Sequence, residues 1–166
     1  MVISEDGTVS DRTRAESTAV IVDSSDVGNW VHLAATIDVS PTPTVVLYKN
    51  GSSVDITYTS QGATSIYDGA TSVRIGAMET TPIELFDGMI DEVRIWNDIR
   101  TAAEISDNRS VELIGNEANL QGYWKLENNY LDSTANDNDL TPSGTPAFST
   151  DVPFSGTTTS TSTTTT

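Results

Sequence analysis

The sequence predicts an all-β fold, an antiparallel sandwich with one short helix. Three observations support this: short apolar runs with alternating residues, turn signals between the runs, and a single helix-start pattern. Only 36% of the 166 residues are hydrophobic, but these residues are concentrated in the runs. The length and this concentration indicate one folded domain with a core of its own.

Short runs of apolar, β-branched and aromatic residues mark the expected strands. The clearest alternation lies in residues 30–38, which we expect to form a half-buried strand. Asn50 and Gly51 lie between two apolar runs and predict a tight hairpin, because both residues tolerate a positive φ. In chain order, the expected strands are residues 1–4, 19–22, 30–38, 45–48, 54–58, 73–77, 86–96 and 120–126.

One helix and one tail complete the expected elements. Thr101 is followed three residues later by Glu104, which matches a capping box and predicts a helix over residues 102–109. Residues 155–166 are a Ser/Thr tract that cannot build a core, so we expect a tail or linker beyond a domain of residues 1–154.

The chain is strongly acidic, with 24 acidic and eight basic residues and a net charge of −16. This charge argues against nucleic acid and anionic membrane surfaces as partners, because both require clustered Lys and Arg. No apolar run approaches the ~18 residues of a membrane span, so we expect no membrane insertion. The chain has no cysteine and therefore no disulfide or thiolate metal site.

One carboxylate conflicts with the apolar pattern of residues 86–96. In a regular strand, Asp91 would lie on the same face as Met89, Val93 and Ile95. If that face is the core, Asp91 must find hydrogen-bond donors or a cation, because an unpaired buried charge is too costly.

Four motifs occur in a familiar order, and together they resemble the laminin G-like, concanavalin A-like jelly-roll superfamily in its bacterial or viral form. The resemblance implies a jelly-roll sandwich. The motifs are WVHLA at 30–34, LYKNG at 47–51, FDGMIDEVRIW at 86–96 and AAEI at 102–105.

The match departs from the family at its start, because such domains carry several strands before the WVHLA motif and only 29 residues precede it here. Three explanations stay open. Residues 122–154 could supply the missing strands in a permuted order, a neighbouring chain could complete the sandwich, or the sequence could be part of a longer surface protein. We favour completion by residues 122–154, within an oligomer, because unpaired strand edges are a liability.

The resemblance implies a calcium site that joins Asp91 to Asp132, Asn136 and Asn138. Carboxylate and amide oxygens are the ligands that calcium takes. The alternative is that Asp91 accepts hydrogen bonds and that residues 132–139 form a solvated turn, since this loop lacks the glycine and the final glutamate of an EF-hand.

Catalysis is not expected, although some enzymes of this fold cut polysaccharides. Glycoside hydrolysis needs two carboxylates facing each other across about 5–9 Å. Asp91 and Glu92 are adjacent and would point to opposite faces of a strand. His32 is the only histidine, which excludes a multi-histidine metal site.

We therefore predict a non-enzymatic extracellular adhesion or recognition module that binds a glycan or a surface protein, with calcium as its cofactor. The alternative is a structural subunit of a surface filament, surface layer or virion, whose partner is itself or an assembly neighbour. Either function places the protein outside the cell, at a cell surface or on a virion. Aromatic side chains are the candidates for sugar contacts, but no ligand-binding residue is assigned; they are Trp30, Tyr48, Tyr58, Tyr67, Trp96, Tyr123 and Trp124.

Overall fold

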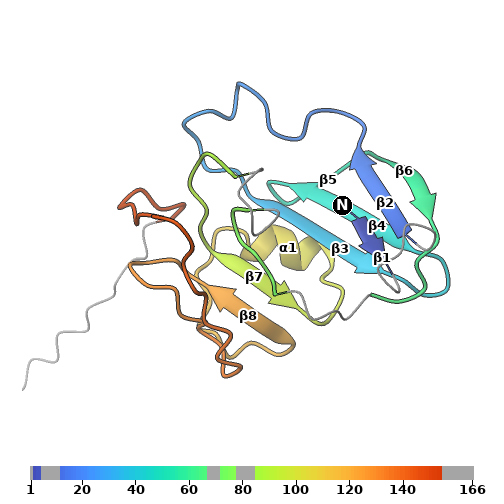
Figure 1. Cartoon of the computed structure of the whole chain (residues 1–166). Coiled ribbons are helices and arrows are strands. Elements are labelled where there is room, and N and C mark those ends of the chain that lie inside the picture. The colour runs from blue at the N-terminus through green and yellow to red at the C-terminus, as the bar shows by residue number, and fades with distance from the viewer. Residues whose placement is uncertain (1, 5–11, 67–71, 78–84, 155–166) are drawn as a thin grey trace, which may run out of the picture. The chain divides into compact units, whose positions relative to one another are not determined.

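The computed structural model describes residues 2–4, 12–66, 72–77 and 85–154 (Figure 1). These residues form antiparallel sheets with one short helix, which confirms the predicted all-β fold class. In chain order the elements are β1 (Val2–Ser4), β2 (Arg12–Ser17), β3 (Leu33–Asp38), β4 (Thr44–Lys49), β5 (Ser52–Val54), β6 (Ile56–Gln61), β7 (Val93–Trp96), α1 (Ala102–Asn108) and β8 (Leu120–Trp124).

The chain divides into two compact units. The first unit comprises Met1–Ile90 and Trp96–Arg109, and the second comprises Asp91–Ile95 and Ser110–Thr166. The expected division into a sandwich over residues 1–154 and a tail stays a prediction, since the tail lies outside the described residues.

Two three-stranded sheets, β1-β2-β6 and β3-β4-β5, build the first unit. The predicted Asn-Gly hairpin is confirmed: Lys49 pairs with Ser52, and Asn50 and Gly51 have φ values of 51° and 81°. Tyr58 joins the two sheets, because its hydroxyl accepts from the N–H of Val45 at 2.7 Å and lies 3.2 Å from the carbonyl oxygen of that residue.

The predicted helix is present as α1 and carries the expected capping box. The Thr101 hydroxyl accepts from the Glu104 N–H, while the Glu104 carboxylate accepts from the Thr101 N–H. The helix packs closely on the hairpin turn, since a Cβ added at Gly51 would lie 3.0 Å from the Ser106 Cα.

In the second unit, β7 pairs with β8, and Figure 1 shows their arrows running in opposite directions. The C-terminal part of the chain thus supplies a strand beside β7. Completion of the sandwich by residues 122–154 stays a prediction. Four residues of this part are buried apolar side chains: Leu113, Leu120, Tyr123 and Trp124.

Three expected strands differ from the structure. Residues 19–22 are irregular with Val20 and Val22 exposed, and β2, which sequence analysis missed, precedes them. Residues 73–77 contain only an isolated bridge from Ala77 to Leu85. The expected strand over 86–96 begins only at Val93, because Glu92 has a φ of 56°.

The half-buried strand over residues 30–38 is present as β3 from Leu33 onward, but its apolar residues Leu33 and Ala35 are exposed. Among the described residues, no helix has the length and apolar character that a membrane span requires.

Candidate functional site

Asp91 does not lie on a buried apolar face with Met89 and Ile95, which is where the alternation in the sequence would place it. Met89 and Ile95, expected to be buried beside Asp91, are 49% and 37% exposed. The side chains of Arg94 and Glu92, expected on the other face, are only 12% and 11% exposed. The positive φ of Glu92 interrupts the alternation, and the two opposite charges can be buried because they pair.

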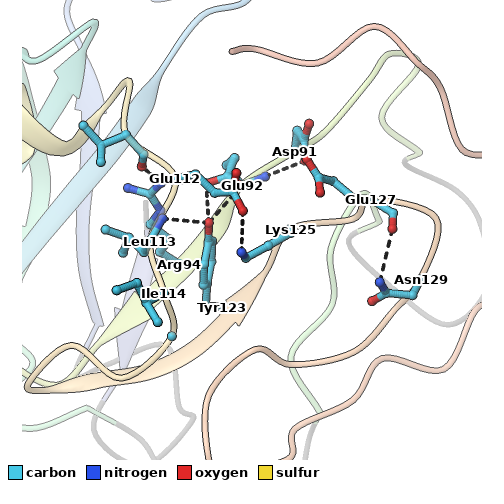
Figure 2. Close-up of polar contacts among 12 residues, drawn as sticks. Asp91, Glu92, Arg94, Glu112, Leu113, Ile114, Tyr123, Lys125, Glu127 and Asn129 are labelled. Carbon is cyan, nitrogen blue, oxygen red and sulfur yellow. Dashed lines mark hydrogen bonds and ion pairs between the residues drawn. The ribbon is translucent and has the colours of Figure 1, made fainter. Parts of the chain in front are cut away.

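A buried hydrogen-bond network centres on the Tyr123 hydroxyl (Figure 2). The hydroxyl lies 2.9 and 2.7 Å from the two carboxylate oxygens of Glu92 and accepts from the Leu113 N–H at 3.1 Å. Arg94 Nη2 lies 2.6 Å from Glu92 Oε2, and the guanidinium also lies over the Tyr123 ring, 5.3 Å from its centroid. Burial and the Glu92 carboxylate raise the pKa of Tyr123 above its usual value, so the hydroxyl remains a donor.

A second cation extends the network toward solvent. Lys125 forms an ion pair with Glu112, and its ammonium group lies 5.4 Å from the centroid of the Tyr123 ring. Arg94 also donates to the carbonyl of Val111. The two cations therefore offset the charges of Glu92 and Glu112 and hold residues 110–125 against 91–95.

Asp91 lies beside this network without an ion pair among the described residues. Its carboxylate accepts from the Glu92 N–H at 2.9 Å, and Figure 2 shows the Glu127 side chain next to it. Burial raises the pKa of Asp91 from 3.8 to about 6. The Glu92 N–H opposes this rise, whereas the carboxylates of Glu92, Glu127 and Glu112 add to it. Asp91 is therefore a carboxyl group that takes up a proton near neutral pH.

Asp132 lies in a different environment, at the centre of the loop after β8. Its Oδ1 accepts from the N–H groups of Tyr123 and Thr134, and its Oδ2 accepts from the Thr134 hydroxyl and the Asn138 N–H. Burial would raise the pKa of Asp132, but these hydrogen bonds outweigh it and hold the pKa below its usual value. Asp132 is thus an ionised carboxylate whose function is to organise the loop.

Only three of the four predicted calcium ligands come together. Asn136 and Asn138 both donate their side-chain amide to the Gln121 carbonyl, and Asn138 also bonds to Asp132. Asp91 has no hydrogen bond to these residues in the described part of the chain. The described residues also contain no group of three or more His, Cys, Asp or Glu side chains suited to a metal.

The arrangement around Asp132 does not fit a calcium ion. Four donors already occupy the two carboxylate oxygens, and an ion would have to displace them. The Asp91 carboxylate accepts fewer hydrogen bonds than Asp132 does, among the described residues. The calcium assignment as a whole stays a prediction.

Three of the seven aromatic candidates for sugar contacts are buried, whereas Trp30, Tyr58 and Trp96 are partly exposed. Tyr48, Tyr123 and Trp124 are buried, and Tyr67 lies outside the described residues. Trp96 is partly exposed, and the Arg100 guanidinium lies 4.4 Å from the centroid of its ring.

The carboxylates around Tyr123 favour a structural role over catalysis. Asp91 and Glu92 are two neighbouring carboxyl groups, the residue type that glycoside hydrolysis uses. However, the Glu92 side chain is only 11% exposed, and Tyr123 and Arg94 both contact its carboxylate, which favours a structural role. The absence of enzymatic activity stays a prediction.

Arg94 was not among the site residues predicted from the sequence, and Tyr123 was considered only as an aromatic candidate for sugar contacts. A usable signal was present for Arg94, since it lies two residues after Glu92, where opposite charges on a strand can pair. No local signal connects Tyr123 to Glu92, because 31 residues separate them.

Residues 4–106 match a laminin G family model described as the concanavalin A-like lectin/glucanases superfamily. Neither the curated proteins nor the solved structures gave a match.

The variant Tyr123→Phe tests the network. Loss of the hydroxyl leaves the Leu113 N–H without its acceptor and Glu92 with fewer donors, so we expect a loss of about 1–3 kcal/mol in unfolding free energy. Chemical denaturation measures this loss. Tyr130→Phe is the control, because that hydroxyl makes only a long, exposed bond of 3.4 Å to the Pro146 carbonyl. Equal effects of the two variants would contradict the network.

The variant Asp91→Asn tests the raised pKa of Asp91. The folded pKa of about 6 exceeds the unfolded value of 3.8, so ionisation of Asp91 destabilises the fold. This penalty is absent below pH 3.8, grows as the pH rises, and is complete above pH 6. After allowance for solvent screening, Asn should stabilise the protein by about 1 kcal/mol, or about 2–4 °C in Tm, at high pH only.

Thermal unfolding of both proteins at about pH 3.5 and about pH 8 checks this expectation, because most of the penalty is absent at the lower pH and all of it is present at the higher pH. A difference in Tm that does not depend on pH would show that Asp91 has an ordinary pKa.

Proposed function

Because the chain belongs to the concanavalin A-like lectin/glucanase superfamily, we propose that it is a non-enzymatic recognition module that binds a glycan or a surface protein. The observation that carries the proposal is the family match over residues 4–106, which spans most of the strands and most of α1. The acidic composition suits a module outside the cell, at a cell surface or on a virion.

The short connection between β7 and α1 is the part of the first unit best suited to hold a sugar. Sugar-binding sites combine an aromatic surface with fixed polar groups. Trp96 supplies a partly exposed ring, and Arg100 is fixed over it by Asp98 at 3.1 Å and Glu104 at 2.7 Å. These groups present donors and acceptors beside one aromatic ring.

A second candidate function is a subunit of a surface assembly. One observation favours it: β7 lies within the family match, but its partner β8 at Leu120–Trp124 lies beyond residue 106. A family strand in this chain therefore depends on a segment that does not belong to the matched region.

We expect binding to immobilised glycans that is weaker in Trp96→Ala. Loss of a central aromatic contact should weaken the affinity by about 30-fold, or about 2 kcal/mol. A glycan array identifies the ligand, and titration calorimetry measures the affinity. Ile99→Ala is the matched control, because Ile99 is an exposed apolar residue in the same connection.

Equal affinity in both variants would remove Trp96 from the site, and an array without any signal would argue against a glycan ligand. Release of reducing sugar from the bound glycan would contradict the non-enzymatic part of the proposal.

Calcium dependence is a separate part of the proposal. It predicts that Tm is higher in calcium than in chelator, because calcium at 100-fold excess over Kd should add about 2.7 kcal/mol to the free energy of unfolding. Asp91→Asn should abolish this rise in Tm. Asp137→Asn is the control. Asp137 is an exposed acid of the loop that contains Asp132, Asn136 and Asn138, but it is not one of the predicted calcium ligands. The same Tm in calcium and chelator would remove calcium from the proposal.

A further inference from the structure

Residues 110–154, called the C-terminal arm below, are held together by contacts within the arm itself. The Ser133 N–H donates to the Tyr123 carbonyl at 2.8 Å, and Trp124 Nε1 donates to the Asn138 carbonyl at 2.9 Å. Gly115, with a φ of 104°, lies so close to the Ser133 carbonyl that an added Cβ would be 2.1 Å from its oxygen. None of these contacts uses a residue outside the arm, so they do not depend on where the arm docks.

The arm docks on residues 91–95 through a defined set of contacts. β8 pairs with β7, the Tyr123 hydroxyl bonds to the Glu92 carboxylate, and Arg94 donates to the Val111 carbonyl. Tyr123 is fully buried. Residues 91–95 without the arm would expose a strand edge and leave a buried ion pair without its donor, so this surface requires an arm.

A single chain crossing connects the arm to the first unit. The crossing lies between Arg109 and Ser110, and Val111 already contacts Arg94, so the hinge is very short. α1 ends without a left-handed residue at the position after its C-cap Arg109, since Ser110 does not have a positive φ. Short hinges next to a regular element favour exchange of the segment beyond them between copies.

We propose that the C-terminal arm of one copy docks on residues 91–95 of a second copy, and that the second arm returns the exchange. All contacts between the arm and residues 91–95 are the same within one chain and between two chains. The equilibrium between the closed monomer and the exchanged dimer therefore depends on the hinge. It also depends on the protein concentration relative to the effective concentration of the tethered arm. This inference deepens the assembly candidate above and is independent of glycan binding, because it names the exchanged segment and its docking surface.

Two single-cysteine variants of the full chain test the exchange, and the natural absence of cysteine makes the labels unique. Ile95→Cys lies on β7 and Val111→Cys on the arm, next to the Arg94 contact, and both positions are exposed. The two variants are mixed, refolded together at increasing concentration, and treated with a short bis-maleimide. We expect a product of twice the 17.7 kDa chain mass that contains one copy of each variant.

The control pair is Ile95→Cys with Val27→Cys, because Val27 is an exposed residue of the first unit. The mixed product should exceed this control several-fold and grow with concentration. A flexible Gly/Ser insertion between Arg109 and Ser110 should reduce it, since a relaxed hinge lets the arm close on its own chain.

Light scattering on the unmodified chain separates the outcomes and does not depend on whether the cysteine variants fold. An oligomer that gives no more 95–111 crosslinked product than the control pair overturns the exchange but leaves the assembly candidate intact. A chain that stays monomeric after concentrated refolding, with no 95–111 crosslinked product above the control, overturns both. Loss of glycan binding has no bearing on either result.

Discussion

The hydrogen bond between the Tyr123 hydroxyl and the Glu92 carboxylate is the interaction on which the second unit depends. Tyr123 is fully buried, so its hydroxyl needs a partner inside the protein. Glu92 needs donors for the same reason, and Arg94 balances its charge. Once these three side chains are fixed, the β7–β8 pairing and the nearby positions of Lys125 and Asp91 follow from the backbone.

The same network explains why Asp91 has a different environment from the one its position in the sequence suggests. A regular strand would place Asp91 among apolar side chains, but the positive φ of Glu92 breaks the alternation before β7 begins. The face with the charged pair becomes the buried one, because Glu92 and Arg94 satisfy each other. Hydropathy patterns cannot predict this reversal, since they count every charged residue as exposed.

Local chemistry was predictable from the sequence, and long-range pairing was not. The Asn50-Gly51 turn and the Thr101–Glu104 capping box depend on residues close in sequence, and both are present. β2 was missed because its sequence, RTRAES, has one apolar residue, and its buried positions Thr13 and Ala15 are small. Residues 19–22 have more apolar character but no strand partner among the described residues. In the site, Asp91 and Asp132 were found as acids, but the burial of Asp91 and the bond from the Tyr123 N–H to Asp132 depend on the tertiary fold.

The two acids differ in what a cation could contribute to each. Asp132 is stabilised in its ionised form by four donors, so a cation would have to replace interactions that already exist. Asp91 is destabilised when ionised, because burial and neighbouring carboxylates oppose its charge. A proton or a metal ion would relieve the same unfavourable charge, and the two would compete for one carboxyl group. Any cation that binds among these carboxylates therefore gains most of its stabilisation at Asp91, and a rise in pH through its pKa strengthens that binding.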